Sequence, residues 1–78
     1  SEPMRPEELV ARVFGLLPDE GADATGPETC EDWDSLGHLN LVLEMEQVYG
    51  VALSTDDALA ITDVASMKRI LAERGARW

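Results

Sequence analysis

Apolar residues recur at helical spacing in separate segments of the chain, and no segment alternates in the way that a half-buried β-strand does. The first segment carries its apolar stripe at Leu9, Val13, Leu16 and Leu17. The last segment carries a similar stripe at Val64, Met67, Ile70 and Leu71. This pattern predicts an all-α fold.

Capping residues set the bounds of the first two helices. Pro6 suits a first helical turn, so the first helix is predicted from Pro6 to Leu17. Asp34 can cap a second helix that begins near Ser35 and ends near Tyr49, because a glycine follows. The segment between them, from Pro18 to Trp33, lacks helical periodicity and carries Asp and Glu but no Lys or Arg. It is interpreted as a long acidic loop.

Two further helices complete the prediction. Ser54 or Thr55 can cap a short helix that runs through Ala60. Thr62 is predicted to cap the last helix, which ends before Gly75. The chain is therefore expected to be a bundle of three longer helices and one short helix, with a long first loop.

Size and charge narrow the function classes. Sixteen acidic against six basic residues give the 78-residue chain a formal net charge of −10. This charge opposes binding to nucleic acid or anionic lipid and favours partners with basic patches. A domain of this size buries only roughly 60% of its unfolded surface, so a deep catalytic cleft is not expected.

The remaining calls on organisation concern tails and location. Residues 1–5 are interpreted as an N-terminal tail, of which Ser1-Glu2-Pro3 could be a cloning remnant, residues 6–75 as the folded domain and residues 76–78 as a C-terminal tail. Cys30 is the only cysteine, and no apolar run approaches the roughly 18 residues that span a bilayer. The N-terminus also lacks the features of a secretory signal. We expect a cytoplasmic monomer without membrane association.

The second predicted helix has two apolar groups rather than one. At about 100° per residue, one broad arc can face the other helices. This buried arc is expected to contain Leu41, Val42, Met45, Val48 and Tyr49. The other group forms a partly exposed docking strip beside Ser35, consisting of Leu36, Leu39 and Leu43 and rimmed by Asn40, Glu44 and Gln47. The alternative is that this helix is buried nearly all round.

Residues 33–43 read W-D-S-L-G-H-L-N-L-V-L, which resembles the prosthetic-group site of acyl carrier proteins. The long acidic loop, the serine-led helix, the short helix and the closing helix follow the order of that family along nearly the whole chain. The resemblance implies an acyl-carrier-like four-helix bundle over residues 6–75. It also implies a cofactor-attachment site at Ser35, flanked by the motif residues Asp34 and Leu36.

In this resemblance Ser35 carries 4′-phosphopantetheine, which a separate phosphopantetheinyl transferase takes from coenzyme A. The terminal thiol holds acyl groups as thioesters, so the protein is a non-catalytic, discrete carrier. Its other partners are acyl-loading and acyl-processing enzymes with basic docking patches. Asn40 and Gln47 stand where acids are common in fatty-acid-synthesis carriers, which favours polyketide or other secondary-metabolite biosynthesis.

Several alternatives stay open. The attachment motif does not encode the cargo, so a carrier for aminoacyl groups or a peptidyl carrier is an alternative to the acyl carrier. An unmodified helical adaptor that uses the leucine strip is an alternative from another class. His38 could approach Ser35, but no second acid completes a triad, and ligands for a metal are lacking at usable spacing. Gly37 could allow close approach of the arm or of a partner. An acyl chain could insert among Phe14, Leu39, Val42, Ile61 and Met67, although ordinary core packing explains the same residues.

Overall fold

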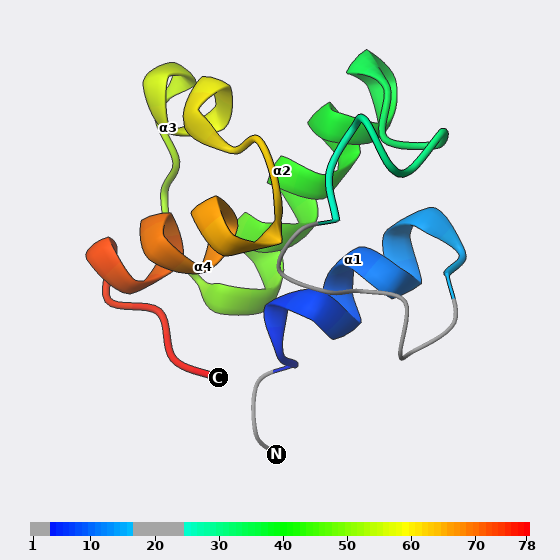
Figure 1. Cartoon of the computed structure of the whole chain (residues 1–78). Helices are drawn as coiled ribbons and strands as arrows, with labels where there is room; N and C mark the ends of the chain where they lie inside the picture. Colours follow the sequence, from blue (N-terminus) through cyan, green and yellow to red (C-terminus); the bar gives the residue numbers. More distant parts are fainter. Residues whose placement is uncertain (1–3, 17–24) are drawn as a thin grey trace.

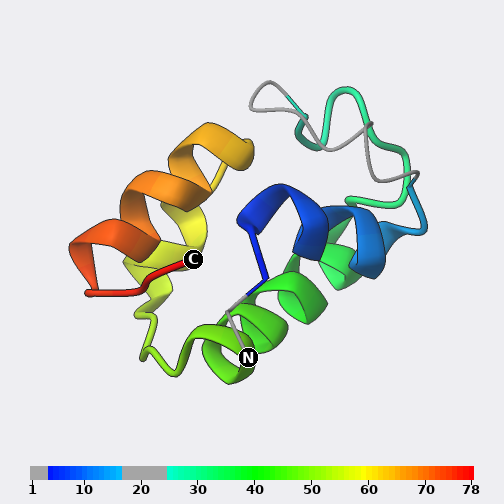
Figure 2. The same ribbon diagram turned by 90° about the horizontal axis from the view of Figure 1, so that it is seen from below.

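The computed structural model describes residues 4–16 and 25–78, and within these ranges it contains four α-helices and no strand. The helices are α1 (Pro6–Phe14), α2 (Ser35–Tyr49), α3 (Thr55–Ala60) and α4 (Val64–Glu73). The predicted all-helical fold, with three longer helices and one short one, is therefore confirmed. The helix α1 packs against both α2 and α4 and runs alongside α2 in Figure 2. In Figure 1, α3 lies above α4 and α1 lies to the right of α4.

The helix α1 ends earlier than the apolar spacing predicts. Gly15 adopts a left-handed conformation with φ 68°, and its amide donates to the carbonyl of Ala11, so the helix stops at Phe14. The predicted end at Leu17 is wrong, and Leu17 itself lies outside the described residues. Leu16 follows the helix and packs half-buried against the core.

The bounds of α2 are as predicted. The Asp34 carboxylate accepts a hydrogen bond of 2.8 Å from the Gly37 amide, and Gly50 ends the helix at φ 64°. The expected buried arc is present, because Leu41, Val42 and Met45 are buried and Val48 and Tyr49 are half-buried. The alternative of a helix buried all round is wrong, since its leucine strip is exposed.

Reciprocal caps begin the two helices at the C-terminal end of the chain. In α3, the Ser54 hydroxyl accepts from the Asp57 amide while the Asp57 carboxylate accepts from the Ser54 amide. In α4, Asp63 accepts from the Ser66 amide and is the cap, so the prediction of a Thr62 cap is wrong by one residue. Ser66 explains the choice, because its hydroxyl accepts from the Asp63 amide in return.

The core gathers apolar side chains from α1, α2 and α4, from the loop that precedes α2 and from the link after α3, and Ala58 of α3 packs against it. Its members are Leu9, Val10, Phe14, Cys30, Trp33, Leu41, Val42, Met45, Ile61, Val64, Met67, Ile70 and Leu71. The predicted tails also take part in packing, since Met4, Ala76 and Trp78 lie against this core. The Tyr49 hydroxyl donates to the Met4 carbonyl, and the Tyr49 ring meets the Trp78 ring edge-on. No helix in the described part of the chain is long and apolar enough to cross a membrane.

Ion pairs join the helices at their surfaces. Lys68 on α4 pairs with Glu7 on α1 at 2.6 Å, and Arg12 on α1 pairs with Glu44 on α2 at 2.8 Å. Arg74 follows α4 as its C-cap residue. Its guanidinium donates hydrogen bonds of 2.7 to 3.0 Å to both carboxylate oxygens of Asp57. Because its guanidinium donates these bonds, Arg74 lowers the pKa of Asp57 below the usual 3.8.

We expect Asp57→Asn to lower the melting temperature at pH 7, because the amide keeps an acceptor for the Ser54 amide but loses the charge that Arg74 binds. The lowered pKa means that this ion pair stabilises the fold above about pH 3.8 and is lost as the pH falls further through the folded-state value. The melting temperatures of wild type and variant should therefore converge once the pH is below the folded-state pKa of Asp57. A gap that is independent of pH would contradict the electrostatic role of Asp57.

Candidate functional site

Ser35 is the first residue of α2, and its side chain is exposed. Within residues 4–16 and 25–78, its hydroxyl makes no hydrogen bond. The Asp34 carboxylate beside it caps the Gly37 amide, while the first amides of a helix have no partner inside the helix. The site therefore presents a free hydroxyl at the positive end of a fixed helix.

The indole of Trp33 anchors the chain just before this hydroxyl. Trp33 is only 2% exposed, and its ring stacks on that of Phe14 with centroids 5.2 Å apart. Trp33 therefore packs the loop before α2 against the bundle. Since Phe14 is the last residue of α1, this contact fixes the start of α2 against the end of α1.

His38 joins three segments through its ring. Nδ1 lies 2.8 Å from the indole nitrogen of Trp33, and Nε2 lies 2.7 Å from the carbonyl oxygen of Ala58 in α3. An indole nitrogen can only donate, so Nδ1 of His38 accepts this hydrogen bond. Nε2 then carries the ring hydrogen and donates it in a hydrogen bond to the carbonyl oxygen of Ala58. Both nitrogens are thus engaged by structural partners, and neither is free to take a proton from Ser35.

Gly37 permits a close internal contact. A Cβ at this position would lie 2.3 Å from the carbonyl oxygen of Asp32 and 2.8 Å from Cε1 of Phe14. Any side chain would push the loop and the Phe14 ring away from the first turn of α2. The sequence hypothesis of an approaching arm or partner missed this reason, because it depends on segments distant in the chain.

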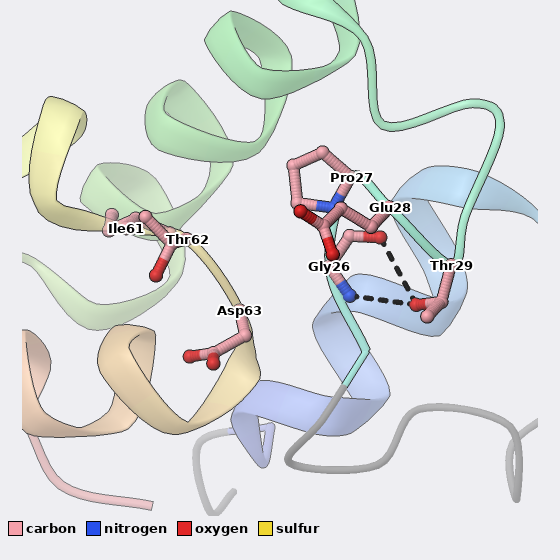
Figure 3. A pocket seen from close by; sticks show the side chains of 7 residues that line it. All are labelled: Gly26, Pro27, Glu28, Thr29, Ile61, Thr62 and Asp63. Atoms are coloured by element: carbon pink, nitrogen blue, oxygen red, sulfur yellow. Dashed lines mark hydrogen bonds between the residues drawn. The ribbon is translucent and has the colours of Figure 1, made fainter.

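An open depression lies directly beside Ser35. It is lined by Pro27, Trp33, Asp34, Ser35, His38, Leu59 and Ile61. Pro27 and Ile61 also line a neighbouring depression that continues toward the start of α4. Figure 3 shows this second depression between Pro27 and Glu28 of the loop and Ile61 to Asp63 of the link between α3 and α4. Together the two form a shallow path that leads away from the hydroxyl.

The predicted exposure of the α2 leucine strip is confirmed. Leu36, Leu39 and Leu43 are 68%, 54% and 52% exposed. Leu59 on α3, which the sequence reasoning missed, is 73% exposed and lines the Ser35 depression from the opposite side. Its only signal was an apolar residue in a helix too short to show periodicity. The serine thus lies between exposed leucines from two helices.

The polar rim of the strip differs from expectation at one residue. Asn40 and Gln47 are exposed, as a docking rim requires. The Glu44 carboxylate, however, is held by Arg12 at 2.8 Å. Arg12, Asn40, Glu44 and Gln47 line a depression between α1 and α2, where the Glu44 carboxylate is paired with the Arg12 guanidinium. Glu44 is therefore a bridge between helices as well as a rim residue.

The candidate acyl-insertion residues divide into two groups. Phe14, Val42, Ile61 and Met67 are buried members of the core, whereas Leu39 is 54% exposed. Leu39 therefore does not line the interior, and its inclusion there is wrong. Cys30 is also a buried core residue. Within the described ranges, no cluster of three or more His, Cys, Asp and Glu side chains could hold a metal ion.

Comparison with known proteins adds no assignment: no protein-family model matches the sequence, and no curated protein matches it in a sequence search. The geometry of the chain itself is therefore the basis of any functional inference.

We expect Gly37→Ala to destabilise the fold by about 1 to 3 kcal/mol, the usual cost of forcing atoms into a packed site. Helix propensity alone predicts the opposite sign, a gain of roughly 1 kcal/mol. Asn40→Ala is the matched control on the exposed side of α2, where alanine should be neutral or slightly stabilising. Urea unfolding measures both, and a stabilised Gly37→Ala protein would show that the close contact is not real.

Proposed function

We propose that this chain is an acyl carrier protein that tethers acyl intermediates as thioesters on a 4′-phosphopantetheine arm attached to Ser35. The observation that carries the proposal is the exposed, unbonded Ser35 hydroxyl at the start of α2. It lies within the W-D-S-L motif on which the resemblance to carrier proteins rests. A four-helix fold with one short helix agrees with that resemblance.

The surroundings of Ser35 suit attachment by another enzyme. In this reaction the serine oxygen forms a bond to the pantetheine-bearing phosphorus of coenzyme A. The bond from that phosphorus to the bridging oxygen of the pyrophosphate breaks, adenosine 3′,5′-bisphosphate leaves, and the transferase removes the serine proton. Such a reaction needs an accessible hydroxyl, and the exposure of Ser35 provides it. The resulting phosphodiester is an anion next to helix amides, which favour negative charge.

The engagement of His38 supports a carrier rather than a hydrolase. A serine nucleophile needs a base within hydrogen-bond reach, with a third group to orient it. Here the Nδ1 and Nε2 atoms of His38 bind Trp33 and Ala58 instead. The chemistry is then left to the arm and to separate enzymes, as in other group-carrier systems.

The exposed leucines of α2 supply a surface for those enzymes. Leu36 adjoins Ser35, and Leu39 and Leu43 continue the strip along the helix. Asn40 and Gln47 are uncharged residues at the rim of this surface. The Glu44 carboxylate at the same rim forms an ion pair with Arg12. We infer a polyketide or other secondary-metabolite pathway with dedicated enzymes, because a strip of this kind lacks the row of free acids common in fatty-acid-synthesis carriers.

Incubation of the purified protein with coenzyme A and a broad-range phosphopantetheinyl transferase should add the mass of one phosphopantetheinyl group. Ser35→Ala should abolish the gain completely, and Cys30→Ala, which alters the buried thiol, should retain it. Intact-protein mass spectrometry measures all three. No gain in the wild type would leave the adaptor alternative, and a gain that survives Ser35→Ala would contradict attachment at Ser35.

Leu39→Asp should slow acyl transfer by the partner enzymes about tenfold, equivalent to about 1.4 kcal/mol, because it places a charge in the middle of the apolar strip. The fold should be retained, since this side chain is exposed. Ala65→Asp is the matched control, which adds the same charge at an exposed position of α4. Equal transfer rates in both variants would remove the proposed docking surface.

A further inference from the structure

The depression beside Ser35 has a floor made of core residues. Trp33 and Ile61 line it, yet they are only 2% and 3% exposed. Phe14 stacks on Trp33 within the same core. A group that lies in the depression therefore meets the top of the packed interior, and deeper entry must displace these side chains.

Hydrogen bonds hold the sides of the depression together. His38 ties α2 to α3 through the 2.7 Å contact between Nε2 and the carbonyl oxygen of Ala58. The same ring holds Trp33 through its Nδ1 atom at 2.8 Å. An acyl chain that passed between α2 and α3 next to Ser35 would have to break the bond to Ala58 or disturb the indole.

The loop side is held against the link between α3 and α4. The Val64 amide donates to the carbonyl of Thr25 at 3.0 Å. A Cβ at Gly26 would lie 2.5 Å from the carbonyl oxygen of Thr62, so the two backbones are in close contact. Figure 3 labels Gly26 on the loop and Thr62 on the link. Both walls of the depression are thus fixed to each other.

The exposed lining includes two apolar side chains beside the polar Asp34 and Ser35. Leu59 stands 73% exposed on one side, and Pro27 is exposed on the loop side. A small apolar or aromatic group could cover Leu59 and the edge of the depression without moving the core. A long alkyl chain would have to lie along the open surface of this depression and its neighbour, where it would gain less burial than in an enclosed interior.

We propose that the cargo of the arm rests in this surface depression rather than in the helical interior, and that the protein suits short apolar or aromatic acyl groups rather than long alkyl chains. The inference rests on the proposed function, because it concerns the group held on the Ser35 arm. Leu59 is the exposed leucine that lines this depression.

The test uses three loaded forms, made by a broad-range transferase from acetyl, benzoyl and octanoyl coenzyme A, with methionine methyl groups labelled for NMR. The methyl resonances of the core residues Met45 and Met67 should be the same in all three forms, and the octanoyl form should melt at the temperature of the acetyl form. The benzoyl form should shift the indole resonance of Trp33. Met4 and Trp78, which do not line the depression, serve as internal references.

An octanoyl chain that shifts the Met45 and Met67 methyl groups and raises the melting temperature would overturn the inference. Failure of loading, seen in the intact mass, would instead overturn the proposed function on which it rests. The two failures are therefore distinguished by whether the arm is present.

Two variants test whether the acyl group contacts Leu59. Leu59→Gln should reduce the benzoyl-induced shift of Trp33, whereas Leu43→Gln, at an exposed leucine outside the depression, should leave it unchanged. Equal shifts in the two variants would contradict the role of Leu59. His38→Ala removes the bond to Ala58 and should allow octanoyl to shift the core methionines. Should His38→Ala fail to fold, the wild-type methyl spectra still decide the question.

Discussion

The position of the candidate site depends on the contacts of one indole. Trp33 stacks on Phe14 and donates to His38, so it joins the end of α1, the loop and the first turn of α2. An aromatic pair contributes about 0.5 to 1.5 kcal/mol beyond its burial, and a hydrogen bond about 1 kcal/mol. These are substantial amounts in a domain whose stability is on the order of 5 to 15 kcal/mol. The direction in which Ser35 points follows from this network.

Most exposed acids lie outside the leucine strip, in the loop before α2 and on the other helices, although Asp34 borders the start of the strip. Both carboxylates of α2 are engaged, since Glu44 pairs with Arg12 and Glu46 accepts from the Leu53 amide at 3.1 Å. Exposed acids lie instead in the loop before α2, at Glu28, Glu31 and Asp32. Long-range attraction of a basic partner and short-range apolar contact would thus act at different places. Electrostatics governs mainly the rate of encounter, whereas the apolar strip would govern how long the partner stays bound.

Features that depend on neighbouring residues could be predicted from the sequence, and features that depend on distant segments could not. Asp34 and Gly50 define α2 correctly because capping is a local interaction. The predicted end of α1 at Leu17 was wrong because the apolar spacing continues to that residue although Gly15 turns the backbone to positive φ. The exposure of the α2 strip followed from helical geometry, whereas the exposure of Ser35 was what the resemblance required. The roles of Gly37 and His38 required the positions of Phe14 and Ala58, which no local pattern supplies.

The first turn of α2 combines an exposed anchor with buried supports. Ser35 faces solvent at the first helical position, while Gly37 and His38, two and three residues later, are half-buried against the loop and α3. Because successive residues of a helix point about 100° apart, one turn can serve both purposes. A tether attached there would move about a rigid point, so the reach of its cargo would be set by the arm and by the docking of the partner. Under the proposed function a small core would be sufficient, since it would have to hold one turn of helix in place and would not have to enclose a substrate.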